Sequence, residues 1–112
     1  MTEQIERPQH MRALDRANEI RLARAALKRK VAAGKASAAD IVEEVPPETE
    51  SMTIAELLTS QRRWGRTRAR KFLSTLLLNE NKRLGDLTHR QRKMLVDELR
   101  AKLAGGEEQI AA

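Results

Sequence analysis

Between Pro8 and Gly34, apolar residues recur at intervals of three and four, the spacing that places side chains on one face of an α-helix. Pro8 suits the first turn of such a helix, and Gly34 suits the position just beyond its end. Residues 1–7 are polar, and we expect them to be disordered. The apolar stripe is narrow and rich in alanine, so most of this helix should lie outside a core; it comprises Ala13, Ala17, Ile20, Ala23, Leu27 and Val31.

The pattern predicts a second, shorter helix over 38–45, with Ser37 as its N-cap. Its apolar side contains Ile41, Val42 and Val45. Pro46-Pro47 then stops the helix and forms a stiff connector. We therefore predict a linker at 46–51, which separates an N-terminal part, residues 1–45, from the compact domain.

Two capping-box patterns organise the C-terminal half, Thr53-x-x-Glu56 and Thr88-x-x-Gln91. The first predicts a helix over 54–60, and the second opens a last helix that Gly105-Gly106 should end. A wide apolar face between them predicts a helix over 66–77; it comprises Ala69, Phe72, Leu73, Leu76 and Leu77. From the last helix we expect inward-facing Met94, Leu95, Leu99 and Leu103. Residues 52–106 thus form the predicted domain, and 107–112 a frayed tail.

Composition agrees with an all-α fold, a long basic N-terminal helix followed by a small helical domain. Aromatic residues make up only 2% of the 112 residues, Tyr and Cys are absent, and Leu and Ala dominate the apolar set. Without Cys, neither a disulfide nor a thiolate metal site can form. No run of about 18 apolar residues occurs, so we expect a soluble cytoplasmic protein without a membrane segment.

The chain is strongly basic, with a formal net charge of +6, which suits a polyanion such as DNA, RNA or an acidic membrane surface. Six of its cations fall within residues 62–73, which contain no acid and the only Trp, and which run into the predicted helix over 66–77. Gly65 would let a ligand approach the backbone closely, and the first helical turn would offer unpaired N–H groups and a positive dipole end. These features are typical of a phosphate site; its candidate residues are Arg62, Arg63, Trp64, Gly65, Arg66, Thr67 and Arg68.

Two observations leave alternatives open. Trp64 can be a residue at the rim of the core, or it can rest against a sugar or a base. Arg21, Arg24 and Lys28 share one face of the first helix, which can be a solvated surface or a secondary contact with nucleic acid.

Catalysis finds little support in the sequence. His10 and His89 lack the neighbouring Ser, Asp or Glu pattern that nucleophilic or acid–base chemistry uses. Acidic residues gather between Asp40 and Glu50, but without His they are more typical of a solvated face than of a metal site. We therefore expect no enzyme activity, no cofactor and no metal.

Several motifs resemble the actinobacterial integration host factor family, whose members are nucleoid-associated DNA-binding proteins. The motifs are Met52-Thr53-Ile54-Ala55-Glu56-Leu57-Leu58, Trp64-Gly65-Arg66-Thr67-Arg68-Ala69, Lys82-Arg83-Leu84 and Arg90-Gln91-Arg92-Lys93. Upstream, Arg24-Ala25-Ala26-Leu27-Lys28 and Gly34 are similar to the family's long basic helix and its end.

The resemblance implies a helix–two-turn–helix fold and sequence-independent binding and bending of duplex DNA. It places phosphate contacts on Arg66 and Arg68, and further contacts on Lys82 and Arg83. The chain departs from the family pattern in its bulkier, more basic segment 61–64 and in Gly85-Asp86, where the family has a third cation. Such divergence would suit a paralogue or a phage-carried relative.

The leading hypothesis is thus an architectural protein of the nucleoid that binds duplex DNA as a monomer and supports DNA recombination with an integrase complex. An rRNA-binding, ribosomal-protein-like module and a helical protein-interaction module are the alternatives. The scarcity of aromatic residues argues against a dedicated single-strand binder.

Overall fold

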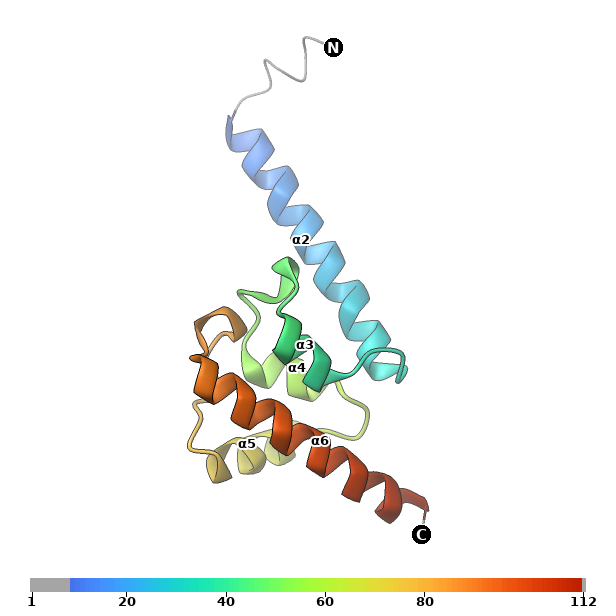
Figure 1. The fold of residues 1–112 in the computed structure, drawn as a ribbon. Helices are drawn as coiled ribbons and strands as arrows, with labels where there is room; N and C mark the ends of the chain where they lie inside the picture. The colour runs from blue at the N-terminus through green and yellow to red at the C-terminus, as the bar shows by residue number, and fades with distance from the viewer. Residues whose placement is uncertain (1–8, 112) are drawn as a thin grey trace.

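The structure, a computed structural model, describes residues 9–111, with side-chain environments from 11 to 102. The described residues form five α-helices and two short 3-10 turns, in agreement with the predicted all-α fold (Figure 1). The helices are α2 (Gln9–Ala32), α3 (Ala38–Glu44), α4 (Ile54–Ser60), α5 (Arg66–Thr75) and α6 (His89–Ala111), and the 3-10 turns are η1 (Pro47–Thr49) and η2 (Leu84–Asp86). The expected disorder of residues 1–7 and the role of Pro8 lie outside the described residues.

Helix α2 projects from the body formed by the other helices and touches it only with its C-terminal half (Figure 1). Leu27 is half-buried and Val31 is buried, whereas Met11, Leu14 and Leu22 are exposed. The helix ends where the sequence predicts, because Gly34 adopts a φ of 78°, the left-handed conformation that favours glycine. The Gly34 N–H donates to the Val31 carbonyl and the Lys35 N–H to that of Lys30, the two bonds of a Schellman motif.

The predicted caps also form. Thr53 Oγ1 accepts a hydrogen bond from the Glu56 N–H at 3.1 Å, and Ser37 Oγ accepts one from the Asp40 N–H at 3.4 Å. At the start of α6, Thr88 and Gln91 form a complete capping box, with reciprocal bonds of 3.0 and 3.1 Å. These bonds satisfy N–H groups that a helix start leaves without partners, which explains why the helices begin at these residues.

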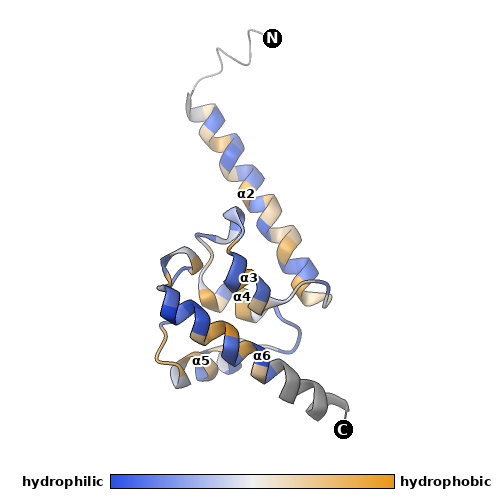
Figure 2. Cartoon of the chain, viewed as in Figure 1, coloured by the Kyte–Doolittle hydropathy of each residue, from blue (hydrophilic) through white to orange (hydrophobic). Residues whose placement is uncertain are grey.

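The core lies between α3, α4, α5 and α6, and hydrophobic positions of these helices turn toward it (Figure 2). Its largest fully buried side chains belong to Met52, Ile54, Leu57, Leu58, Leu73, Leu84 and Leu95. A short antiparallel bridge between Thr53 and Arg83 ties the start of α4 to the connector that follows α5. The connector is thereby held against the core, although it has little helical structure.

The structure differs from the predicted division of the chain at 46–51. These residues form η1, where Thr49 is fully buried and its hydroxyl donates to the Pro46 carbonyl at 2.7 Å. On one side of them, α3 packs against α6, so the core continues across the predicted linker. The two prolines shape a turn inside one packed unit because the chain on both sides contributes apolar residues to the same interior.

Two predicted helix ends also differ. Helix α5 ends at Thr75, not Leu77, and Leu77 is 91% exposed with a φ of 59° instead of facing the core. Leu78 takes the buried position, because the left-handed residue turns the chain back toward the body. Gly105-Gly106 does not end α6, which continues through Gly105, Gly106 and most of the predicted tail to Ala111. Glycine within a helix costs about 1 kcal/mol but does not by itself stop it.

Within the described residues, no helix combines the length and the apolar composition needed to cross a bilayer.

Candidate nucleic-acid interface

The start of α5 is an open helix end. A turn closed by a bond from the Trp64 N–H to the Gln61 carbonyl, with Arg63 at a φ of 71°, leads into Gly65. Gly65 is the N-cap, and it has no side chain to satisfy the first N–H groups of the helix. The first helical bond runs from the Ala69 N–H to the Gly65 carbonyl at 3.1 Å. An anion outside the helix could therefore accept hydrogen bonds from this turn and be stabilised by the helix dipole.

The protein's own backbone does not require glycine at this position. Gly65 has a φ of −85° and a ψ of 178°, which any residue adopts, and a Cβ built on it would meet no atom within 4 Å. By contrast, Gly34 needs its positive φ, and a Cβ on Gly85 would lie 3.0 Å from the Glu50 carbonyl oxygen. The fold itself thus gives no reason for glycine at position 65.

The predicted cationic residues surround this open end. Arg62, Arg63, Arg66 and Arg68 are exposed, as is Thr67 in the first turn. The first turn of α5 contains no acidic residue. The structure therefore brings the predicted residues of segment 62–68 together at one exposed helix end.

Arg70 is different, although it belongs to the same basic stretch. Its guanidinium donates to both carboxylate oxygens of Glu80, at 2.9 and 3.3 Å. Hydrogen bonding from Arg70 holds the pKa of Glu80 below its usual value, with smaller electrostatic contributions from Arg70 and Arg66. Arg70 thus stabilises the connector after α5, and its charge is partly neutralised.

Trp64 adopts the first of its two predicted roles, at the rim of the core, and its contact with a sugar or a base stays a prediction. Its ring is half-buried and meets the edge of Phe72 at 5.3 Å between ring centroids, which makes it part of the rim of the core. The Trp64 ring has a second contact, in which the guanidinium of Arg68 lies over the indole, 4.4 Å from the ring centroid. Arg68 also donates to the Arg63 carbonyl at 3.4 Å, so the turn, Trp64 and the first turn of α5 form one connected surface.

Lys82 and Arg83 lie on the connector, which backbone bonds attach to the start of α4. The Ile54 N–H donates to the Lys82 carbonyl at 2.8 Å and the Leu84 N–H to that of Met52 at 2.9 Å. Arg83 is exposed and Lys82 is half-buried. Among the described contacts, none joins either side chain to segment 62–68.

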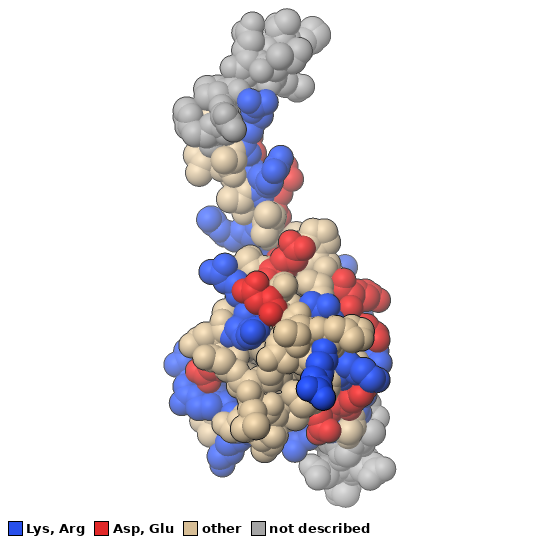
Figure 3. All heavy atoms as spheres, turned by 60° about the vertical axis from the view of Figure 1, so that its left-hand side comes forward, with Lys and Arg blue, Asp and Glu red and all other residues tan. Residues whose placement is uncertain are grey.

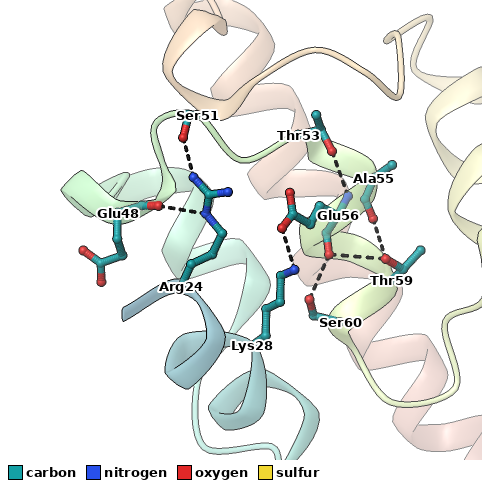
Figure 4. Close-up of polar contacts among 9 residues, drawn as sticks. All are labelled: Arg24, Lys28, Glu48, Ser51, Thr53, Ala55, Glu56, Thr59 and Ser60. Atoms are coloured by element: carbon teal, nitrogen blue, oxygen red, sulfur yellow. Dashed lines mark hydrogen bonds and ion pairs between the residues drawn. The ribbon is translucent and has the colours of Figure 1, made fainter. Parts of the chain in front are cut away.

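The proposed secondary residues on α2 are mostly engaged within the protein. Arg24 donates to the Glu48 carbonyl at 3.3 Å and to the Ser51 hydroxyl, and Lys28 forms an ion pair with Glu56 (Figure 4). Arg21 is exposed. Arg24 and Lys28 thus attach α2 to η1 and α4, a role that the sequence analysis missed.

The acidic segment between Asp40 and Glu50 forms a further attachment, to α6. Asp40 and Glu43 both accept from Arg100 of α6 at 2.9 Å, and these bonds raise the pKa of Arg100 above its usual value. The sequence analysis interpreted these carboxylates as a solvated face; the lack of any cation between Asp40 and Met52 is the signal that could have indicated a distant partner. In the described part of the chain, no group of three or more His, Asp or Glu residues is arranged for a metal ion.

The fold and this surface define a small all-α protein in which one helix begins at an uncapped glycine among exposed arginines. No family model and no curated protein matches the sequence. Among solved structures, the chain is similar to that of sIHF bound to an 8-base-pair palindromic DNA, with a TM-score of 0.68 and 24% sequence identity. The match covers 76% of this chain and 98% of the sIHF chain. The chain therefore has an integration-host-factor-like fold.

Proposed function

We propose that this protein binds duplex DNA through phosphate contacts at the N-terminus of α5, with little dependence on base sequence. The observation that carries the proposal is the uncapped Gly65, which the backbone geometry does not require and which lies among exposed arginines at a first helical turn without acidic residues. The likeness in fold to sIHF, which has been solved bound to DNA, supports the same ligand.

In this proposal, the first N–H groups of α5 and the side chains of Arg66 and Arg68 bind one phosphate region. Arg62 and Arg63 approach the neighbouring backbone from the turn. Lys82 and Arg83 contribute from the connector, and Arg21 extends the contact along α2. Arg24 and Lys28 contribute indirectly by holding α2 against the body, because their own polar groups are already paired.

The proposed role is architectural and does not include catalysis. One copy of the chain carries the whole set of contacts, so binding requires no second copy. Such a protein would act on chromosomal DNA in the cytoplasm, where it bends or compacts the duplex, and it could assist an integrase complex. Figure 3 shows that Lys and Arg side chains lie along the projecting helix as well as over the body, with Asp and Glu among them where the two meet.

The test is the affinity of the parent protein and of Arg66→Ala for several unrelated duplexes at two salt concentrations. If about four to six of these cations bind phosphates at the same time, log K should fall with log salt with a slope of about −4 to −5, at ~0.9 per phosphate. Arg66→Ala should reduce the affinity for every duplex by a similar factor and reduce the magnitude of the salt slope by about one unit. Because Arg66 is exposed, its loss should change stability by no more than about 0.5 kcal/mol.

Arg29→Ala is the matched control, because Arg29 is exposed on α2 and belongs to none of the proposed contacts. A salt slope near zero would refute the phosphate contacts. Tighter binding to duplex RNA than to duplex DNA of the same sequence would favour the ribosomal-protein-like alternative.

A further inference from the structure

A groove adjoins the proposed DNA site. It has a volume of about 560 Å³ and lies between the end of α2, the loop that leads to α3, the turn before α5, and Leu99 and Lys102 of α6. Its lining includes several short side chains, which leave the space between the helices unfilled; among them are Ala32, Ala33, Ala36, Ala38 and Ala39. A volume of this size is typical of sites that enclose a small molecule or part of a larger one.

The groove is strongly cationic. Five of its lining residues carry positive charge, and they come from three separate parts of the chain: Lys35, Arg62, Arg63, Arg68 and Lys102. Its acidic lining residue is Asp40, whose carboxylate already accepts a hydrogen bond from Arg100 at 2.9 Å. The groove therefore favours an anionic occupant.

A cation–π pair also borders the groove. Trp64 and Arg68 are both lining residues, and the Arg68 guanidinium lies over the Trp64 ring at 4.4 Å from its centroid. Phe72 supports the ring through its edge contact, so the pair is held in place from the core side. Guanidinium planes and aromatic rings are the surfaces on which proteins stack single nucleobases.

We propose that the groove receives one unpaired nucleotide of the DNA that is bound at the N-terminus of α5. Its base stacks on the Arg68–Trp64 pair, and the adjacent phosphates lie near Lys35 and Lys102. This inference rests on the proposed function, because Arg62, Arg63 and Arg68 belong both to the groove and to the duplex site. The chain has one Trp, which limits the stacking to one base and distinguishes this site from that of a single-strand binder.

The consequence is a preference for DNA in which a base is already unpaired. Extracting a base from an intact duplex costs a few kcal/mol of lost pairing and stacking, whereas a bulged nucleotide enters the groove without that cost. We therefore expect the protein to bind a duplex with a one-nucleotide bulge about tenfold more tightly than the perfect duplex of the same sequence.

The experiment compares these two duplexes at fixed salt, with anisotropy of labelled DNA for affinity and Trp64 fluorescence for stacking. The bulged duplex should quench Trp64, and the perfect duplex should not. Exchanging both groove lysines, Lys35→Ala with Lys102→Ala, should abolish the tenfold preference and leave affinity for the perfect duplex unchanged. Both lysines are exposed, so the variant should melt like the parent.

Trp64→Phe is the second variant, since it keeps an aromatic ring against Phe72 but offers a smaller platform, and it should reduce the preference. Equal affinity for both duplexes, without quenching, would overturn the groove inference while leaving duplex binding intact. If both variants keep the preference for the bulged duplex, the unpaired base binds elsewhere, and this outcome would also overturn the groove inference. Failure to bind either duplex would instead refute the proposed function.

Discussion

Exchanging Gly65 for serine separates folding from binding at the position on which the proposed site depends. The backbone of Gly65 has ordinary extended angles, and its missing Cβ points into open space, so serine fits without strain. Serine is also a preferred N-cap, and its hydroxyl can accept from the N–H of Thr67 or Arg68. The same hydroxyl and Cβ would occupy the place of an approaching phosphate.

The two effects have opposite signs. Serine at an N-cap is a few tenths of a kcal/mol better than glycine, and the loss of glycine's freedom in the unfolded chain adds about 0.4–1 kcal/mol. Gly65→Ser should therefore melt at the parent's temperature or a few degrees higher. For DNA, the loss of one charge-assisted hydrogen bond costs about 1.5–3 kcal/mol, which corresponds to a fall in affinity of at least tenfold.

The assay pairs thermal unfolding with DNA titration at one salt concentration. Thr88→Gly provides the matched control, because it makes the reverse exchange at the N-cap of α6, where Thr88 accepts from the Gln91 N–H. This control should lose some stability and keep its DNA affinity. Our reasoning would be refuted by a Gly65→Ser protein that melts normally and binds duplex DNA like the parent.

Three further outcomes follow from the described contacts. Arg70→Ala should raise the pKa of Glu80, as measured by NMR titration. Because Arg70 lowers the pKa of Glu80 in the folded protein, the parent should be more stable than the variant above the pKa that Glu80 has in the unfolded chain. This difference in stability should disappear as the pH falls through the folded-state pKa. Leu77→Asn should preserve or increase the melting temperature, because Leu77 is 91% exposed at a φ of 59° and Asn tolerates that conformation better. In the free protein, amide hydrogen exchange should be slower over residues 24–31 than over 11–22, because only the C-terminal half of α2 is attached to the body. Binding of DNA should slow exchange over 11–22. Equal protection of the two halves in the free protein would contradict this.

Local signals in the sequence predicted much of the fold correctly. Ser37, Thr53 and Thr88 act as caps, and Gly34 ends α2, because each of these residues fixes the backbone through bonds within a few positions. Helical periodicity also identified the buried face of α5, apart from Leu77. These features depend on neighbours in sequence, which is why a single sequence contains them.

Apart from the ends of α5 and α6, the failures concern interactions between distant residues. Pro46-Pro47 has the composition of a linker, and only the packing of α3 against α6 makes it part of a single core. Arg24 and Lys28 are indistinguishable in sequence from other surface cations, yet they are paired with groups that follow more than twenty residues later. The basic turn was predicted because its charges are close together in the sequence. The groove beside it is lined by three segments that are far apart in the sequence, so the sequence alone could not predict it.

The pairing of α3 with α6 has a consequence for the order in which the molecule assembles. Arg100 contacts residues that precede it by 60 and 57 positions, whereas α4 and α5 are neighbours in the chain. Because closing a long loop costs more chain entropy than closing a short one, we expect α4 and α5 to meet first and α3 to join α6 late. Until that last step, Ile41 and Val42 of α3 remain without their partner, so a chain that is still being synthesised exposes them until α6 is complete.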